Sequence, residues 1–455
     1  MVKTQAGVTK DLVEKHEHGR GSFKMAILVG GYLLLLGIVG VVLKIVDGFS
    51  DPSKWGYHVG LVVFLMSTAG AAPMVAIAPR MAKAHWRRPI SRIGEIYGAV
   101  GVLTLILFIP VLWVLPGLDD NRRSLWFFND IQMPATMPHI MATLSLVSLV
   151  ALGLALLWLS ALPDLAILRD RSTGSRQKMF ARLANGWSGT SQQWFFQKHR
   201  MGVVGAFYFM TLVITFFFIS VDFSMTLVPG WIDALYPLTQ AQNALQAAAA
   251  TVLVTMYVLH RWGGYREYIT LTQFWGLGKL LFALSLLWIW FWFSSFIIFW
   301  YGAKPAEQAV LELLTVGPYL PIMYIEFALV FLIPLWVLVW NPVRKSVLGP
   351  TLIAIGVLAG TALDRIRVYV ASYSVPGIGD PAVVKHELHA IPDAILPALS
   401  DILIWVGGIG GAAFIFLLVS RVIPVINIWE QKELVLYQIH KKFHRTEVQV
   451  LGKPD

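Results

Sequence analysis

Long apolar runs separated by short polar loops dominate the pattern of this chain. A helix needs about 20 apolar residues to cross the hydrocarbon core of a bilayer, whereas transmembrane β-strands are short and alternate between apolar and polar residues. The pattern therefore predicts an all-α polytopic membrane protein. Ten windows meet the requirement for a spanning helix: residues 25–47, 58–78, 98–115, 139–162, 201–221, 240–260, 270–300, 318–340, 350–371 and 398–423.

The order of these windows suggests how the chain is organised. Helices 2 to 5 and helices 6 to 9 allow two four-helix bundles, flanked by helices 1 and 10, although no clear internal sequence repeat accompanies them. We expect an N-terminal tail at residues 1–24, a membrane domain at 25–423 and a C-terminal tail at 424–455. The first apolar run is long enough to span and lacks a clear cleavage site, so we expect it to be retained.

Composition agrees with this fold class and limits the chemistry of the chain. Of the 455 residues, 57% are hydrophobic and 14% are charged, whereas about a quarter of the residues of a soluble domain are charged. The chain has no cysteine. It therefore cannot hold an iron–sulfur cluster through thiolates, attach haem covalently or form a disulfide, and any such centre must belong to a partner.

The net charge of +10 follows the predicted topology. Of the 36 Lys and Arg residues, 27 lie in the two terminal segments and the loops after the even-numbered helices, when Arg421 at the end of the last helix is counted with the C-terminal segment, and 5 lie in the other loops. Basic residues concentrate on the cytoplasmic side of membrane proteins. We therefore expect both termini to be cytoplasmic, and the charge requires no nucleic-acid partner.

The segment ISVDFSMTLVPGWIDALYP, residues 219–237, places Asp222 at the outer end of an apolar run. Ionisable groups at membrane depth usually mark an ion path, a proton relay or a ligand site. Asp222 is either an interfacial residue reached by water or a buried acceptor for a proton from a bound hydroxyl compound. His139, at the start of the fourth helix, is similarly either a cap or a ligand.

Other ionisable residues lie in or beside the predicted helices. Asp364 and Arg367, three residues apart, share a helix face and suit an ion pair; Arg365 points elsewhere, and Asp222 is a candidate partner for it. Glu326 and Lys279 are interpreted either as a structural pair or, with Glu95, as a proton relay. No helix carries the central histidine that haem ligation needs, and the KHELH segment is expected to be a solvated loop, so no metal site is predicted.

Five segments in order resemble the NrfD/polysulfide-reductase membrane-anchor family, especially the ten-helix subunits of alternative complex III. They are ALPDLAILRDRS, SVDFSMTLVPGW, GLGKLLFALSLLWIWFWFSSFIIFWYG, GPY and DRIRVYV, between about residues 138 and 370. The resemblance implies a cofactor-free subunit of a respiratory or photosynthetic complex in a prokaryotic cytoplasmic membrane. It further implies menaquinone or another quinone as substrate, and partners comprising an extracytoplasmic iron–sulfur protein, cytochrome subunits and a second NrfD-like subunit.

The resemblance also suggests residue roles. Asp222 is similar to the family's helix-5 acid, and Arg365 to the arginine of its helix-9 segment. We expect a quinone site at the outer face within helices 2 to 5, with Asp222 and His139 as catalytic groups and a proton path elsewhere. The remaining candidates are His58, Trp126, Asp130 and Arg365 for quinone binding, and Glu95, Lys279, Glu326 and Asp364 for the path.

Two alternatives stay open. Ala142 and Gln273 stand where the family's quinol-oxidising members often have an acid and a histidine, so this chain is alternatively a structural or proton-conducting paralogue. A secondary transporter, with its embedded charges lining a substrate path, is the other alternative.

Overall fold

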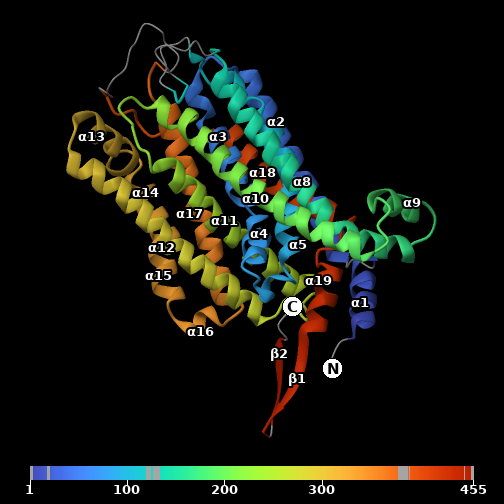
Figure 1. The fold of residues 1–455 in the computed structure, drawn as a ribbon. Helices are drawn as coiled ribbons and strands as arrows, with labels where there is room; N and C mark the ends of the chain where they lie inside the picture. Colours follow the sequence, from blue (N-terminus) through green and yellow to red (C-terminus); the bar gives the residue numbers. More distant parts are fainter. Residues whose placement is uncertain are drawn as a thin grey trace.

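The computed structural model describes residues 4–17, 21–118, 124–126, 134–377, 388, 390–444 and 446–451. The described part is an elongated bundle of helices, and the N and C labels lie toward the same end of it (Figure 1). We call this the terminal end. The opposite end, where α13 (Pro305–Leu311) lies, is called the distal end.

Nine helical segments among the described residues are long and apolar enough to cross a membrane. This confirms the predicted multi-pass helical fold. The segments are Phe23–Asp47, Pro52–Met81, Ser91–Val114, Met137–Arg171, Ser191–Leu227, Tyr236–Gly263, Leu271–Gly302, Leu320–Leu338 and Leu399–Ser420. The predicted window at 350–371 forms the 26-residue helix α17 (Leu348–Tyr373), which carries Asp364, Arg365 and Arg367 and is not among the nine.

Several spans consist of more than one helix, since short 3₁₀ or π-helical segments and turns divide them. The remaining elements are α1 (Gln5–Glu17), α2 (Gly21–Asp47), α3 (Gly56–Leu65), α4 (Met74–Met81), α5 (Ser91–Tyr97), α6 (Gly101–Phe108), α7 (Val111–Val114), α8 (Met137–Arg171), α9 (Gly174–Leu183), α10 (Ser191–Asp222), α11 (Tyr236–Val258), α12 (Leu271–Gly302), α14 (Leu320–Phe327), α15 (Ile333–Leu338), α16 (Asn341–Arg344), α18 (Leu399–Ser420), α19 (Ile428–Tyr437), β1 (Gln438–Phe443) and β2 (Thr446–Leu451).

The C-terminal segment departs from the all-helical prediction. Strands β1 and β2 pair antiparallel from Gln438 opposite Leu451 to Phe443 opposite Thr446. The predicted tail also contains residues that pack on the bundle, because Ile428 and Glu430 of α19 are fully buried. This tail is therefore in part an integral layer of the terminal end.

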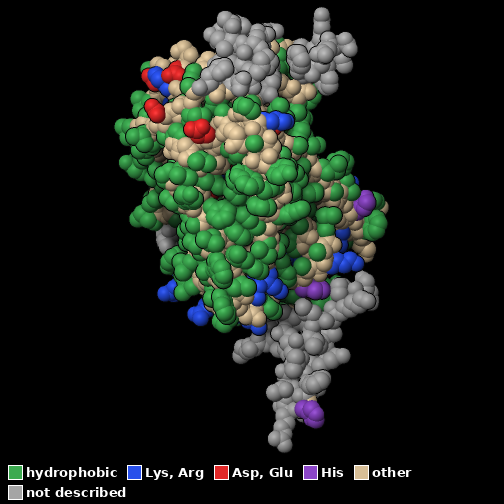
Figure 2. Space-filling model, turned by 90° about the vertical axis from the view of Figure 1, so that its left-hand side faces the viewer, with side chains coloured by type: hydrophobic (Ala, Val, Ile, Leu, Met, Phe, Trp, Pro, Cys, Tyr) green, Lys and Arg blue, Asp and Glu red, His purple; other side chains and the backbone are tan. Residues whose placement is uncertain are grey.

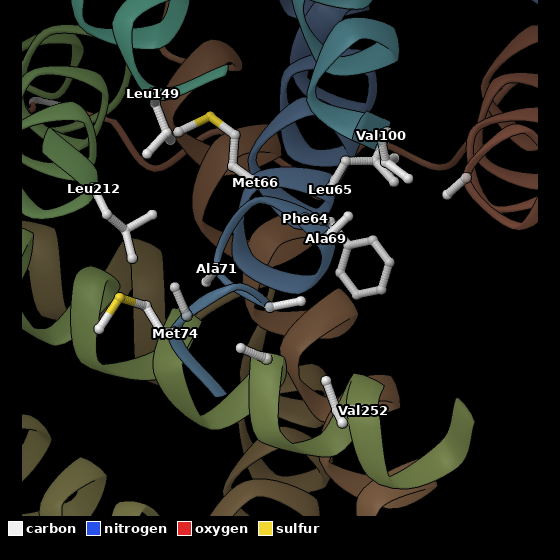
Figure 3. Close-up of a cluster of buried hydrophobic side chains, with 14 of the residues drawn as sticks. Phe64, Leu65, Met66, Ala69, Ala71, Met74, Val100, Leu149, Leu212 and Val252 are labelled. Carbon is white, nitrogen blue, oxygen red and sulfur yellow. The ribbon is translucent and has the colours of Figure 1, made fainter. Parts of the chain in front are cut away.

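The span Pro52–Met81 is interrupted near its middle. A π-helical segment, Met66–Gly70, follows α3, and a turn at residues 71–73 separates it from α4. Such interruptions need packing from neighbouring helices to be stable in a bilayer. Figure 3 shows this packing, in which side chains around the interruption meet side chains from adjacent helices: Phe64, Leu65, Met66, Ala69, Ala71, Met74, Val100, Leu149, Leu212 and Val252.

Helices α2 and α18 pack closely through small residues. A Cβ atom added to Gly407 would lie 2.1 Å from the Cα atom of Gly37, so both positions need glycine at this crossing. Small residues at crossings let helix backbones approach and gain dispersion contacts in lipid. A buried ion pair between Lys44 and Asp401 joins the same two helices toward the distal end.

The surface matches a protein embedded in lipid. Hydrophobic side chains cover the middle of the face in Figure 2, and several basic side chains lie toward the terminal end. Acidic side chains on that face gather toward the distal end. This separation agrees with the distribution of Lys and Arg along the sequence.

Candidate functional site

A cavity in the distal half of the molecule combines aromatic walls with ionisable residues. It lies between α11, α12, α14, α17 and the π-helical segment Glu312–Val316, has a volume of about 90 Å³ and is partly open to the outside. Its aromatic lining comprises Trp231, Tyr236, Trp288, Trp292, Phe296 and Phe299. Its polar lining includes Asp233, Gln240, Asn243, Ser295, Glu326, Asp364 and Arg367.

Helix α12 supplies the largest aromatic wall. Residues three or four positions apart lie on the same side of a helix, and Trp288, Trp292, Phe296 and Phe299 follow this spacing. The rings of Trp292 and Phe296 stack with centroids 5.3 Å apart and planes 5° apart. The spacing therefore produces a stack of aromatic rings that lines the cavity.

Arg367 connects the acids of the cavity. Its Nε donates to Glu326 Oε2 at 2.8 Å, and its Nη2 donates to Asp364 Oδ1 at 3.0 Å. Its Nη1 donates to the carbonyl oxygen of Leu314 at 2.7 Å. The ion pair predicted between Asp364 and Arg367 is confirmed.

Arg365 pairs with a different acid from the one expected. Its Nη1 donates to Asp364 Oδ2 at 2.6 Å, so its acid partner is Asp364 and not the candidate, Asp222. Its Nε and Nη2 donate to Ser67 Oγ at 3.1 and 3.0 Å, and Nη2 also donates to Asn243 Oδ1 at 3.0 Å. Arg365 thus connects the cavity's ion cluster to the π-helical interruption of the second span.

Glu326 is also placed differently from the expectation. One sequence interpretation paired it with Lys279, but it lies next to the last residue of α14, at the level of Asp364 and Arg367. Lys279 is exposed on α12, with its ammonium 4.0 Å from the centroid of the Trp275 ring. The expected pair between Glu326 and Lys279 is therefore replaced by Glu326 with Arg367.

Helix α11 contributes unpaired amide groups. Asn243 accepts from Arg365 through Oδ1, and because a guanidinium can only donate, its Nδ2 is the remaining donor. Within the described part of the chain, Asn243 Nδ2, Gln240 Oε1 and Gln246 Oε1 are buried without a hydrogen-bond partner. Buried polar atoms normally find a partner. Gln240 and Asn243 line the cavity, so their unpaired atoms suit a polar ligand or water there.

Asp233 anchors the start of α11 beside the cavity. Its Oδ1 accepts from the backbone nitrogens of Leu235 at 2.8 Å and Tyr236 at 3.1 Å, while its other oxygen accepts from Ser295 of α12. These contacts fix the turn that leads into α11 and join it to α12. Asp233 thus holds this part of the cavity lining in place.

Asp222 lies apart, at the end of α10, and is fully buried. Its Oδ1 accepts from Ser124 Oγ at 2.6 Å and its Oδ2 from Trp126 Nε1 at 3.1 Å. The structure therefore brings together two residues of the predicted quinone site, Asp222 and Trp126. Both oxygens of Asp222 are occupied by donors from the loop, which gives it a clear structural role in holding that loop.

The two histidines of the predicted site contact backbone carbonyls. His58 Nε2 lies 2.7 Å from the oxygen of Leu107, and His139 Nε2 lies 2.9 Å from that of Leu115. Carbonyls at helix ends lack partners within the helix, so each ring satisfies one. Asp130 lies outside the described residues.

A second ion cluster occupies the terminal end. Arg92 contacts Glu95 at 3.3 Å and Asp164 at 3.0 Å, and Arg80 contacts Glu95 at 2.7 Å. This network places Glu95 in a buried, paired position. Glu430 of α19 completes it by contacting Arg87 at 2.7 Å and Arg80 at 3.4 Å.

The pairing of Glu430 predicts an acid-dependent stability. Burial alone would raise the pKa of Glu430, but the guanidinium groups of Arg87 and Arg80 hold it at about 2. Its folded pKa is thus below its unfolded value, so its contribution is full above about pH 5 and is lost as the pH falls toward 2. The unfolding midpoint of Glu430→Gln, followed by tryptophan fluorescence, should change less than that of the unaltered chain between about pH 6 and pH 3. Equal changes of the unfolding midpoint in the two proteins would contradict this assignment.

The fold and the hydrophobic surface define a multi-pass helical membrane protein. Neither a protein-family model nor a curated protein matches this chain. Its function must therefore be argued from the cavity itself.

Sequence reasoning missed several residues of this cavity. Asp233, Gln240, Asn243 and the aromatic wall of α12 were not proposed as site residues, although each left a signal in the sequence. The amides Gln240, Asn243 and Gln246 recur at helical spacing within the apolar sequence of α11. An amide stripe in an apolar helix predicts an interior face that meets polar partners.

Proposed function

We propose that this chain is a cofactor-free membrane subunit of a quinol-linked electron-transfer complex, similar to the NrfD/polysulfide-reductase family, and that its distal cavity binds the quinone head group. One observation carries the proposal: a stacked aromatic wall, unpaired amide atoms and the Glu326–Arg367–Asp364 cluster share one cavity. Small-molecule sites commonly combine apolar walls with a few polar groups that fix orientation. This location replaces helices 2 to 5 as the proposed site.

The cavity offers groups that contact the ring, bind one ring oxygen and accept one of the two protons of a quinol. Oxidation of a quinol to a quinone releases two protons and two electrons. The aromatic wall that includes Trp292 and Phe296 packs against the ring, and Asn243 Nδ2 donates to one ring oxygen. Glu326 accepts a proton from a hydroxyl group. The electrons pass to a cluster on a partner, since the chain has no cysteine to hold one.

Glu326 is better suited than Asp364 to accept that proton. Asp364 is held by two guanidinium groups, those of Arg365 and Arg367, whereas Glu326 contacts that of Arg367 alone. Protonation of Glu326 also leaves Arg367 its contacts with Asp364 and the Leu314 carbonyl. Fewer favourable interactions are therefore lost when Glu326 becomes neutral.

A polar stripe on α11 gives the proton a route toward the terminal end. Beyond Asn243 it continues through Gln246, whose Nε2 donates to Ser285 Oγ at 2.8 Å, and through Thr255, whose hydroxyl lies 2.7 Å from that of Tyr97. Glu95 lies two residues before Tyr97 in α5, on a different side of that helix. We include Glu95, Glu326 and Asp364 in this path and leave out the exposed Lys279.

The proposed topology counts α17 as a tenth span. Ten spans place both termini on one side of the membrane, and the excess of Lys and Arg makes that side cytoplasmic. The distal cavity then lies toward the outer face of a prokaryotic cytoplasmic membrane, below an extracytoplasmic iron–sulfur partner. Helices 2 to 5 and 6 to 9 form the two bundles in this arrangement.

Purification in mild detergent tests the proposal. We expect the tagged chain to bring down an iron–sulfur protein and cytochrome subunits, and the complex to show cluster reduction upon addition of menaquinol. A chain that purifies alone and without redox-active partners would instead favour a secondary transporter.

A further inference from the structure

A cleft at the terminal end has the features of a lipid head-group site. It lies between α4, the segment 82–88, α10 and α19, and has a volume of about 460 Å³. It is separate from the distal cavity, and its interpretation is independent of the proposed quinol function. Its lining is basic on one side and apolar on the other.

The basic side carries more positive than negative charge. Arg80, Lys83, Arg87, Arg88 and Lys198 line the cleft together with one acid among the described residues, Glu433, while Glu95 and Glu430 behind the lining pair with Arg80 and Arg87. Glu433 contacts both Arg88 at 3.3 Å and Lys198 at 3.0 Å, so one carboxylate serves two cations. The positive surroundings also act on His85, whose pKa is lowered by burial and by Arg88 and Arg87.

Some guanidinium donors in this cleft are buried and unused. Arg87 is 8% exposed, and its Nε has no hydrogen-bond partner among the described residues. Arg80 Nε and Nη1 are likewise buried without a partner there. Buried donors normally find an acceptor. Phosphate oxygens suit the planar N–H groups of arginine.

The apolar side opens toward the hydrophobic surface of the bundle. Met81, at the end of α4, is 67% exposed and lines the cleft beside Ile77 and Gly202. Gly202 has no neighbouring atom within 4 Å of the position that a Cβ would occupy. An acyl chain can therefore leave the cleft along α4 and α10 while the head group stays at its basic side.

We propose that this cleft binds the phosphate of an anionic phospholipid in the leaflet at the terminal end. Basic pockets between membrane helices bind such head groups. The unused arginine donors contact the phosphate, Lys83 and Lys198 attract it electrostatically, and the apolar side accommodates an acyl chain. The same lipid bridges α4 and α19, two segments far apart in the chain.

Lipid binding to the delipidated full-length protein in detergent tests this site. The probe is a fluorescent phosphatidylglycerol. A fluorescent phosphatidylcholine serves as the comparison lipid, and inorganic phosphate serves as the competitor. We expect preferential binding of phosphatidylglycerol. The double variant Lys83→Ala/Lys198→Ala should weaken it roughly 20-fold, from about fivefold for each basic residue near a membrane surface.

Matched controls separate this site from a general charge effect. Lys178→Ala/Arg261→Ala removes two exposed basic residues outside the cleft and should leave the affinity within about twofold. Unfolding of each variant without lipid verifies its fold. Equal binding of the two lipids, or equal losses in both double variants, would overturn the proposal. Complete displacement by millimolar inorganic phosphate would also overturn it, because the site would then select a free anion.

Discussion

Replacement of Arg367 by methionine should lower the free energy of unfolding by about 3–5 kcal/mol, since removing one partner of a buried ion pair leaves the other charge uncompensated. The guanidinium of Arg367 forms ion pairs with Glu326 and Asp364. Asp364 also pairs with Arg365. Its loss would also free the carbonyl of Leu314. Chemical or thermal unfolding of the full-length protein in detergent measures the effect.

Two further variants test the reason for this effect. In the double variant Glu326→Gln/Arg367→Met, the unpaired carboxylate is absent while Asp364 keeps Arg365, so part of the lost stability should return. Lys304→Met removes an exposed cation from the same end of the molecule and should change stability by less than about 0.5 kcal/mol. If the Arg367 and Lys304 variants had the same free energy of unfolding, the buried cluster would not stabilise the protein as assigned.

The second large effect concerns turnover. Glu326→Gln keeps the size of the side chain and an oxygen that accepts from Arg367, but it cannot take up a proton. Loss of a general base typically costs about 100-fold or more in rate. We therefore expect quinol-dependent reduction of the partner's cluster to fall by that factor while the complex remains assembled.

The turnover assay also distinguishes the two candidate locations. Glu307→Gln is the matched control, because it removes a carboxylate of the distal end that does not line the cavity. Asp222→Asn should reduce turnover less than Glu326→Gln, because Asp222 mainly holds the loop through Ser124 and Trp126. A normal rate in Glu326→Gln with loss of activity in Asp222→Asn would return the site to helices 2 to 5.

Helix positions were accessible from the sequence because crossing a bilayer imposes a length and an apolar composition on each segment. The sequence did not show which residues each charged side chain contacts. The Asp364–Arg367 pair follows from helical spacing on one element, whereas the contacts of Arg365 with Ser67 and Asn243 depend on how three separate helices pack. Periodicity along one helix carries no information on such contacts.

The histidines illustrate a second limit. The position of His139 at a helix start suggested either a cap or a ligand, and His58 was expected to bind quinone; both rings instead contact backbone carbonyl oxygens, those of Leu115 and Leu107. Which carbonyls lack a partner depends on where α6 and α7 end, and hydropathy does not give these ends to the residue. The aromatic spacing of α12 and the amides of α11 were readable, but only the packing shows that they face the same cavity.

Photoaffinity labelling with an azido-menaquinone analogue tests the location of the quinone most directly. The full-length protein, in its purified complex, is irradiated with the analogue and digested, and the labelled peptides are identified by mass spectrometry, with excess menaquinone as competitor. We predict competed labelling in residues 231–243 of the α11 region and 288–299 of α12, which line the distal cavity. Competed labelling confined to the neighbourhood of Asp222 and His139, with none in α11 or α12, would contradict the account.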